Sequence, residues 1–129
     1  MKNISFDFDG TLSFIDMDGK ECMFHIQNFC KALVQEKIHE IFIITRRNSF
    51  DPQETFEVFN LAARLGIKKE NVIFTNREYK YGTIKQLDIH VHIDDDWDDI
   101  DRIHKHTTCK AAWSLDREVE LKFANLNNE

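Results

Sequence analysis

The sequence lacks any apolar run of about eighteen residues, the length that a membrane-spanning helix needs. It also lacks a charged stretch followed by an apolar and a small-residue stretch, the pattern of a secretory leader. We therefore expect a soluble, cytoplasmic protein with no membrane partner. Cysteine is scarce as well. Cys22, Cys30 and Cys109 are an odd number without C-x-x-C spacing, which favours reduced, buried thiols over a disulfide or zinc framework.

Internal repeats, low-complexity stretches and interdomain linkers are missing too. A chain of 129 residues can bury a sizeable core but leaves no room for a second domain, so we expect a single domain over residues 1–129. The net charge of −6 argues against a phosphate-rich partner. Six of the carboxylates, however, lie within residues 94–101. A cation bound there would weaken this objection to an anionic substrate.

Two carboxylates separated by one residue follow the first apolar segment, residues 4–6. Because strand residues two positions apart point to the same side, Asp7 and Asp9 face one site if the extended geometry continues. Carboxylates this close repel each other unless a cation such as Mg²⁺ lies between them. Gly10 permits a turn, and Thr11 offers a hydroxyl and an N–H to an anion. A strand end with an Asx turn is the structural alternative.

Two kinds of apolar pattern alternate along the rest of the chain. Apolar residues at intervals of three and four predict helices over residues 24–37, 52–65 and 97–105, with a shorter pattern through Ile84 and Leu87. Short apolar runs predict strands over residues 41–44, 72–75, 89–93 and 108–113.

Two further signals complete the expected elements. An Asp-Gly pair at residues 18–19 predicts a β-hairpin over residues 14–24, and Asp116 suits the cap of a last helix. Five strands alternating with helices predict an α/β fold with a doubly wound parallel sheet. In such a sheet the site lies beyond the carboxyl ends of the strands.

Polar side chains follow or interrupt the predicted strands. Thr45 ends the strand at 41–44, and the guanidinium groups of Arg46 and Arg47 offer planar forks to phosphate oxygens, although solvated loop charges explain them equally well. Alternation along the strand at 89–93 places Ile89, Val91 and Ile93 on one face and His90 and His92 on the other, where the histidines could chelate a metal. No third ligand lies near them in the sequence.

The segment Asp7-Phe8-Asp9-Gly10-Thr11-Leu12, directly after an apolar strand, resembles the first motif of the haloacid dehalogenase (HAD) superfamily, whose members are mostly phosphatases. The resemblance implies a three-layer Rossmann-like fold with a five-stranded parallel sheet and a β-hairpin flap over the site. The short spacing between the motifs implies that there is no cap domain. The resemblance also makes Asp7 the nucleophile that becomes an aspartyl-phosphate, and Asp9 the general acid and base.

The remaining motifs of the family follow in order. The resemblance implies that Thr45 hydrogen-bonds the transferring phosphoryl group and that a lysine neutralises the charge around it. Lys80 has the better position for this role, with Lys85 second. Arg46 and Arg47, with Thr11, are expected to bind the substrate.

The acidic run after the strand at 89–93 resembles the metal motif of the family. The resemblance implies that Mg²⁺ is held by Asp7, by the backbone carbonyl of Asp9 and by Asp95, with Asp99 acting through water. The other register, Asp94 with Asp98, stays open. As an isolated feature, the run would be a solvated helix start, where acidic residues favour the helix dipole.

Taken together, these motifs predict a Mg²⁺-dependent phosphatase that hydrolyses a phosphate monoester through an aspartyl-phosphate. Capless members of the family commonly take bulky substrates, so we expect a nucleotide, a polynucleotide end or another bulky phosphate. Nucleic acid would then be a partner only as substrate, and an oligomer that covers the site stays open. The main alternative is a non-catalytic Mg²⁺-binding α/β module that holds a phosphorylated partner, and a metal-dependent nuclease is a third reading.

Overall fold

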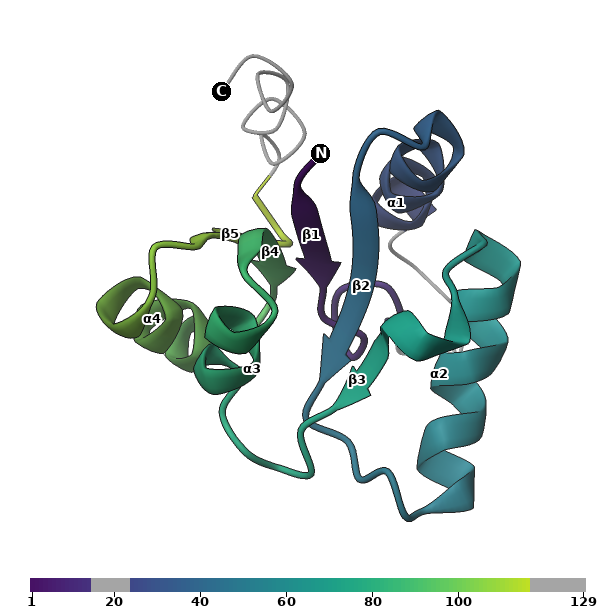
Figure 1. Cartoon of the computed structure of the whole chain (residues 1–129). Coiled ribbons are helices and arrows are strands. Elements are labelled where there is room, and N and C mark those ends of the chain that lie inside the picture. The colour runs from purple at the N-terminus through teal and green to yellow at the C-terminus, as the bar shows by residue number, and fades with distance from the viewer. Residues whose placement is uncertain (15–23, 117–129) are drawn as a thin grey trace.

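A five-stranded parallel sheet forms the centre of the computed structural model, which describes residues 1–14 and 24–116 (Figure 1). The strands are β1 (Asn3–Phe6), β2 (Glu40–Thr45), β3 (Val72–Phe74), β4 (Ile89–Asp94) and β5 (Lys110–Trp113), in the order β3-β2-β1-β4-β5. The helices are α1 (Phe24–Glu36), α2 (Pro52–Leu65), the short 3₁₀ helix η1 (Lys69–Asn71), α3 (Tyr81–Gln86) and α4 (Trp97–His106). The predicted fold class is confirmed.

Two expected elements lie outside the described residues. One is the β-hairpin flap predicted over residues 14–24, of which only Phe14 and the start of α1 are described. The other is the last helix after Asp116. No cap is inserted between the strands within residues 1–14 and 24–116. None of the helices described is long and apolar enough to cross a lipid bilayer.

The helix ends follow local chemistry that the sequence predicts. Asp51 caps α2, because its carboxylate accepts from the backbone N–H groups of Gln53 and Glu54, and Pro52 occupies the first helical position. Gly66 ends the same helix in the left-handed conformation, at φ 82°. Asp96 caps α4 by accepting from the N–H of Asp98. These caps determine where α2 begins and ends and where α4 begins.

Alternation along the strands divides the core between the two faces of the sheet. Ile4 and Phe6 of β1 belong to the larger apolar cluster, which includes buried residues of α1 and α2. A smaller cluster lies on the other face, where Ile44 of β2 packs with Ile84 of α3 and Ile103 of α4. Ser5 of β1 is fully buried although it is polar. The sheet therefore carries a polar position beneath α3 and α4.

One prediction about strand β4 is wrong. The sequence alternation placed Ile89, Val91 and Ile93 on one face, but Ile89 packs in the smaller cluster while the other two pack in the larger one. The pairing of β1 with β4 shifts register between Asn3 and Ile4, so one residue of β4 is extra there. After this irregularity His92 pairs with Ser5.

The central position of β1 determines where the site forms. β1 pairs with β2 on one side and with β4 on the other, so the residues that follow these three strands meet at one edge. The loops beyond this edge are tied together, because Thr75, Asn76 and Arg77 donate backbone hydrogen bonds to the carbonyls of residues 45, 47 and 46, at 2.8, 3.2 and 2.7 Å. These three hydrogen bonds, called the loop tie below, bring the chain back to the carboxyl edge of the sheet before α3 begins.

Candidate active site

Lys80 lies buried between two carboxylates at the carboxyl ends of the strands. Its Nζ is 2.7 Å from Oδ1 of Asp7 and 2.6 Å from Oδ2 of Asp94, and the residue is only 2% exposed. The backbone N–H of Lys80 donates to Oδ1 of Asp99 at 3.0 Å, so α4 fixes the residue that precedes α3. An ammonium group is buried this deeply only when it is paired and hydrogen-bonded. The cluster is therefore a built ionic site.

Three carboxylates converge around this lysine. One oxygen each from Asp7, Asp94 and Asp95 lies within 4.8 Å of the others. Three carboxylates against one ammonium leave two negative charges unbalanced. Carboxylate oxygens in such a group are the ligands that a hard divalent cation prefers. The donor set and its surplus charge both fit Mg²⁺.

Gly10 gives Asp95 room to join the group. Its φ is +77°, and a Cβ atom on it would lie 2.1 Å from Oδ2 of Asp95, far inside van der Waals contact. Any larger residue would push Asp95 away from Asp7. The glycine that follows the two aspartates is thus required by the shape of the carboxylate group.

The electrostatics of the cluster separate its members. Burial raises the pKa of Asp7 well above its usual range against the opposing pull of Lys80, and the charge of Asp94 adds to the rise. Burial also raises the pKa of Asp95. For Asp94, the hydrogen bonds from His92 and Lys80 and the charge of Lys80 outweigh burial and lower the pKa. Burial alone would lower the pKa of Lys80, but Asp7 and Asp94 raise it. Lys80 and Asp94 therefore form a persistent ion pair, while burial disfavours the charged form of Asp7, which a bound cation would stabilise.

His92 is a site residue that the sequence reasoning interpreted differently. Its Nε2 is 2.8 Å from Oδ2 of Asp94 and its Nδ1 is 2.7 Å from Oγ of Ser5, with the ring fully buried. Burial lowers the pKa of His92 despite the carboxylate beside it, so the ring is neutral. A carboxylate only accepts, so we assign the proton to Nε2, and the Ser5 hydroxyl donates to Nδ1. Both nitrogens are engaged, which leaves neither for a metal; the i, i+2 spacing of His92 and Asp94 was the available signal.

Asp9 lies in a different environment from Asp7. Its carboxylate accepts two hydrogen bonds from Arg47, at 2.8 and 2.9 Å, and its side chain is 59% exposed. Arg47 is held in turn by the backbone carbonyl of Glu54 at 2.9 Å and by the ring of Phe8 at 4.7 Å. The side chain of Asp9 is therefore outside the group of three carboxylates, and the metal ligand predicted there is the backbone carbonyl alone.

Two threonines differ in what they offer to a ligand. Thr45 ends β2, lines the cavity and accepts from the N–H of Arg47 at 3.3 Å. Thr11 was predicted to bind substrate, but its hydroxyl is fully buried and donates to Oδ2 of Asp7 at 3.5 Å. The Thr11 side chain therefore contacts Asp7 and is not among the residues that line the opening, and its role in substrate binding stays a prediction.

The opening above the carboxylates is a cavity of about 330 Å³. All of the predicted site residues except Thr11 line it, with Arg77 and Asp96 in addition: Asp7, Asp9, Thr45, Arg46, Arg47, Arg77, Lys80, Asp94, Asp95, Asp96 and Asp99. Arg77 has a positive φ of 72° and its backbone carbonyl accepts from Arg46 at 3.0 Å. No sequence signal marked it, because its position depends on the loop tie described above.

The structure distinguishes the two registers of the acidic run. Oδ2 of Asp99 is buried without a hydrogen-bond partner among the described residues, 3.9 Å from Nζ of Lys80 and 4.0 Å from Arg46. Asp98 is exposed and contacts Tyr79 and Arg102 on the outer side of α4. The geometry therefore favours Asp95 with Asp99, while Asp94 joins the group through its ion pair with Lys80.

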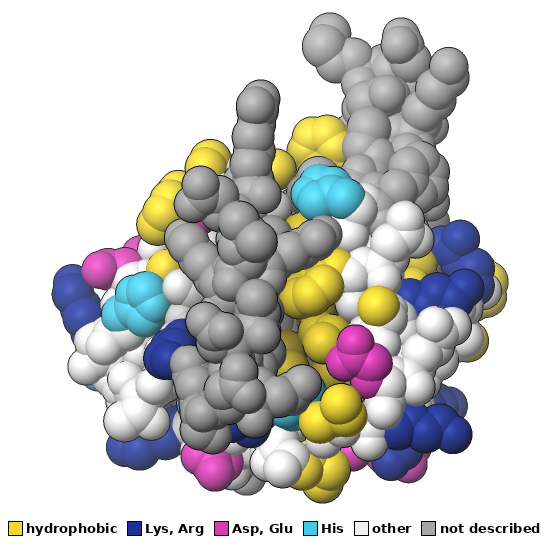
Figure 2. Space-filling model, turned by 90° about the horizontal axis from the view of Figure 1, so that it is seen from above, with side chains coloured by type: hydrophobic (Ala, Val, Ile, Leu, Met, Phe, Trp, Pro, Cys, Tyr) yellow, Lys and Arg dark blue, Asp and Glu magenta, His cyan; other side chains and the backbone are white. Residues whose placement is uncertain are grey.

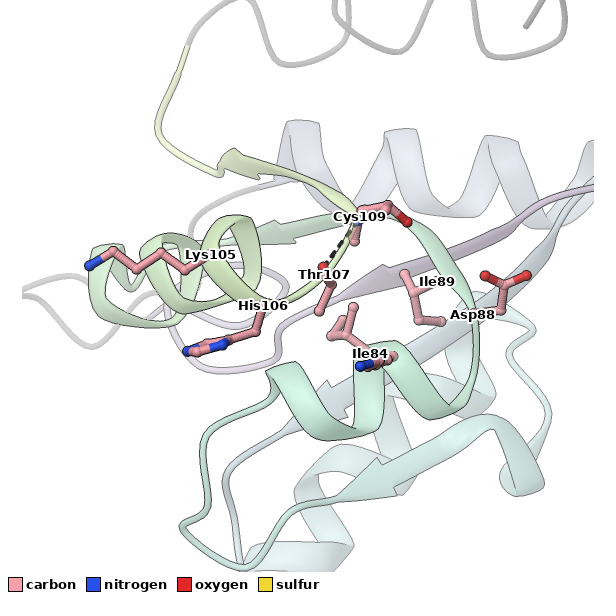
Figure 3. A pocket seen from close by; sticks show the side chains of 9 residues that line it. Ile84, Asp88, Ile89, Lys105, His106, Thr107 and Cys109 are labelled. Atoms are coloured by element: carbon pink, nitrogen blue, oxygen red, sulfur yellow. Dashed lines mark hydrogen bonds between the residues drawn. The ribbon is translucent and has the colours of Figure 1, made fainter.

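A second cavity, of about 410 Å³, lies at the amino ends of the strands between the ends of α3 and α4 (Figure 3). Lys85, the alternative to Lys80, lines this cavity instead of the carboxylate group. Its single acidic lining residue is Asp88, and burial raises the pKa of the lining Cys109 thiol to about 12. The same end of the molecule shows basic side chains spread around its edge (Figure 2). The carboxylates converge only at the opposite end among the residues described.

Comparisons with known proteins identify the fold. No family model matches the sequence, and no curated protein matches it. Among solved structures, the chain is similar to 3-deoxy-D-manno-octulosonate 8-phosphate phosphatase from Moraxella catarrhalis, crystallised with magnesium, phosphate and the sugar acid, with a TM-score of 0.53 and 23% identity over 84% of this chain. A Vibrio cholerae protein provisionally assigned the same activity gives a TM-score of 0.48 and 26% identity over 80% of this chain.

The match is partial on the side of these proteins. The chain spans 64% of the length of the first and 62% of the second. The sheet order, the helices on both faces and the site at the carboxyl edge nevertheless agree with the expectation from the first motif. This chain has a HAD-like α/β fold, which it shares with the phosphatase from Moraxella catarrhalis.

Proposed function

We propose that this chain is a Mg²⁺-dependent phosphatase that hydrolyses a phosphate monoester through an aspartyl-phosphate on Asp7. The observation that carries the proposal is the buried Lys80, which joins Asp7 to Asp94 beside Asp95. The 2.7 Å contact of Lys80 with Asp7 supports this proposal over a non-catalytic module. The Moraxella catarrhalis phosphatase of similar fold is consistent with this activity.

The residues of the site supply each step of the reaction. An oxygen of Asp7 attacks phosphorus, a P–O bond forms, and the bond to the leaving oxygen breaks while that oxygen takes a proton from Asp9. Asp9 then accepts a proton from water, whose oxygen attacks the phosphoryl group and releases inorganic phosphate and the free Asp7 carboxylate. Lys80 and Thr45 stabilise the charge on the equatorial oxygens. Thr11 and Lys80 hold the Asp7 carboxylate in one orientation.

Mg²⁺ would be held by Asp7, Asp95 and the Asp9 backbone carbonyl, with Asp99 as an acceptor for its water. When bound, it screens the repulsion between a carboxylate nucleophile and a phosphate dianion. Asp94 is already neutralised by Lys80 and accepts a hydrogen bond from His92, so it supports the site as the partner of both. This assignment accounts for each carboxylate of the cluster.

Asp9 must leave Arg47 before it can act as an acid. Its side chain is 59% exposed, so it can turn towards the cavity when a substrate anion takes its place on the guanidinium. Arg46 and Arg77 line the same side of the cavity. We infer that these arginines bind the part of a bulky substrate that carries further negative charge.

Phosphate release tests the proposal directly. The native protein is incubated with an aryl phosphate, a sugar phosphate and 3′- and 5′-phosphorylated oligonucleotides, with Mg²⁺ or EDTA. We expect release that needs the metal and falls at least about 10³-fold in Asp7→Asn. The exposed Asp98→Asn is the matched control and should retain the activity.

The alternative functions predict other outcomes. No release from any substrate, with Mg²⁺ binding intact by calorimetry, would indicate the non-catalytic module that holds a phosphorylated partner. Cleavage of internal phosphodiesters would indicate the nuclease. Trapping of a phosphorylated protein whose signal disappears in Asp7→Asn would support the covalent intermediate. A cytoplasmic location and the oligomeric state stay predictions.

A further inference from the structure

The two tryptophans of the chain stack on each other. The ring centroids of Trp97 and Trp113 are 5.4 Å apart and the ring planes are inclined by 33°. Trp97 is 60% exposed, although a large aromatic ring gains free energy from burial. Trp113 is half-buried and supports the exposed ring from one side. An exposed indole held against a second indole is a preformed flat surface.

The elements that carry the carboxylates also place this pair. Trp113 pairs in register with Asp94, and the next residue, Ser114, donates its N–H to the carbonyl of Asp94 at 2.8 Å. Trp97 follows Asp95 by two residues at the start of α4, so the two Cα atoms lie within about 7.6 Å. The stacked pair therefore lies next to Asp94 and Asp95, which line the opening, on the side of β4 and β5, although neither indole lines the opening itself.

The two sides of the opening differ in charge. Arg46, Arg47 and Arg77 line it on the side of β2 and β3. Trp97, in contrast, is flanked along the chain by Asp96, which lies 3.6 Å from Arg46, and by Asp98, which lies 3.5 Å from Arg102 and has 58% of its side chain exposed. An anionic group is therefore favoured on the first side over the second. A planar group without negative charge suits the exposed indole.

We propose that Trp97, supported by Trp113, stacks on a neutral nucleobase of the substrate. The phosphate to be hydrolysed would lie at Asp7, and any further phosphate would lie on the arginine side. The substrate class is then a nucleotide, either free or at the end of an oligonucleotide. This inference rests on the proposed phosphatase function and deepens it. Stacking of one base on an aromatic side chain tightens binding by about 5- to 150-fold.

The tryptophan fluorescence of this protein comes from the stacked pair alone, because the sequence has no other tryptophan, so it reports on binding there. The Asp7→Asn variant with saturating Mg²⁺ is titrated with adenosine 5′-monophosphate and, in parallel, with ribose 5-phosphate, which has the same phosphate and sugar but no base. We expect saturable quenching of tryptophan emission by the nucleotide and binding at least about fivefold tighter than that of ribose 5-phosphate. Equal affinities would overturn the proposal.

Variants separate stacking from a structural role of the ring. Trp97→Ala should weaken nucleotide binding about tenfold, measured by calorimetry, and leave ribose 5-phosphate binding unchanged. Trp97→Phe keeps a ring and should retain most of the preference for the base. Ile38→Ala, an exposed apolar side chain next to the amino end of β2, is the matched control. Equal loss of both ligands in Trp97→Ala would overturn the proposal, as would a Trp97-dependent dimer in sedimentation with no base preference.

The binding experiment and the turnover experiment can fail separately. Base-dependent quenching without phosphate release by the native protein would contradict the phosphatase and leave the stacking intact. Release from aryl or sugar phosphates with no preference for a base would contradict the stacking alone. A 5′-phosphorylated oligonucleotide that binds more tightly than the mononucleotide would identify a polynucleotide end as the preferred form.

Discussion

Asp7 and Asp9 leave the same strand two residues apart, yet their environments have little in common. Asp7 is 5% exposed, contacts Lys80, and has its pKa raised by burial. The side chain of Asp9 is 59% exposed and is paired with Arg47. The first carboxylate is fixed by buried partners, and the second can exchange its partner at the surface. The two aspartates of one short motif are therefore suited to different roles.

The difference matches what the two proposed roles demand. A nucleophile has to meet phosphorus in one orientation, so a fixed and partly desolvated carboxylate suits it. An acid that later becomes a base has to reach the leaving oxygen and then water, so a mobile, solvated carboxylate suits that role. Burial, rather than residue type, separates the two aspartates.

Replacing each aspartate in turn is the strongest way to break this comparison. We expect Asp7→Asn to lower phosphate release at least about 10³-fold and Asp9→Asn to lower it by about 10²- to 10⁴-fold. Mg²⁺ binding, measured by calorimetry, should weaken only in Asp7→Asn, because the proposed ligand at Asp9 is its backbone carbonyl. Equal loss of Mg²⁺ affinity in both variants would contradict the distinction.

Removing Lys80 should affect the buried aspartate through stability. Lys80→Met leaves Asp7 and Asp94 facing each other without their shared cation, and we expect the free energy of unfolding in EDTA to fall by about 3–5 kcal/mol. Lys85→Met, at an exposed position of α3, should change the free energy of unfolding by less than about 0.5 kcal/mol. Chemical denaturation of the two variants makes the comparison, and equal effects would remove Lys80 from the cluster.

Metal removal and pH together test the protonation of Asp7 in the folded state. Because the pKa of Asp7 is raised in the folded state, this group stabilises the fold below the usual carboxyl pKa, and that contribution is lost as pH rises through the raised value. In EDTA, stability should therefore fall over this pH range. Mg²⁺ binds the carboxylate form, so its stabilising effect should grow over the same range, to about 2.7 kcal/mol at one hundred times Kd. A pH-independent effect of Mg²⁺ would contradict the assignment.

His92 should matter through its contact with Asp94. His92→Phe removes the donor to a buried carboxylate and leaves the Ser5 hydroxyl without its acceptor, so we expect a loss of about 1–3 kcal/mol in the free energy of unfolding. Substitution of the exposed His25 by Phe controls for the change of residue type. Thermal unfolding with and without Mg²⁺ measures both variants, and indistinguishable midpoints would remove His92 from the site.

The pair of Arg47 with the exposed Asp9 should give the smallest change in stability. Arg47→Gln removes this ion pair together with the contacts of Arg47 with the Glu54 carbonyl and the Phe8 ring, so we expect a loss of about 1 kcal/mol. The kinetic effect should lie in KM, because the guanidinium is proposed to bind the substrate anion. A large fall in kcat at unchanged KM would show that Arg47 acts on the chemical step instead.

Local sequence patterns predicted the helix caps and the fold class. The caps at Asp51 and Gly66 depend on neighbouring residues, and the segment from Asp7 to Leu12 predicted both the fold and the edge where the site forms. Arg77 could not be found in this way, because backbone hydrogen bonds between distant loops place it. Lys80 could not be separated from Lys85, since nothing local shows which end of a short helix faces the carboxylates.

The misplacement of Ile89 has a similar origin. Strict alternation holds only while the pairing register is constant, and the register of β1 and β4 shifts between Asn3 and Ile4. The contact of Arg47 with Asp9 joins residues 38 positions apart and carries no local signal. Features set by long-range pairing were therefore missed, whereas features set by neighbours were predicted.

The backbone tie between the β2–α2 and β3–α3 loops has a consequence for protein engineering. Residues 75–77 hold residues 45–47 through three main-chain hydrogen bonds, and Asn76 and Arg77 adopt positive φ to do so. The two loops thus form one exchangeable cassette. A chimera that imports only one of them would break the tie, so libraries aimed at a new substrate range should transplant both loops together and randomise only side chains that point away from the shared backbone.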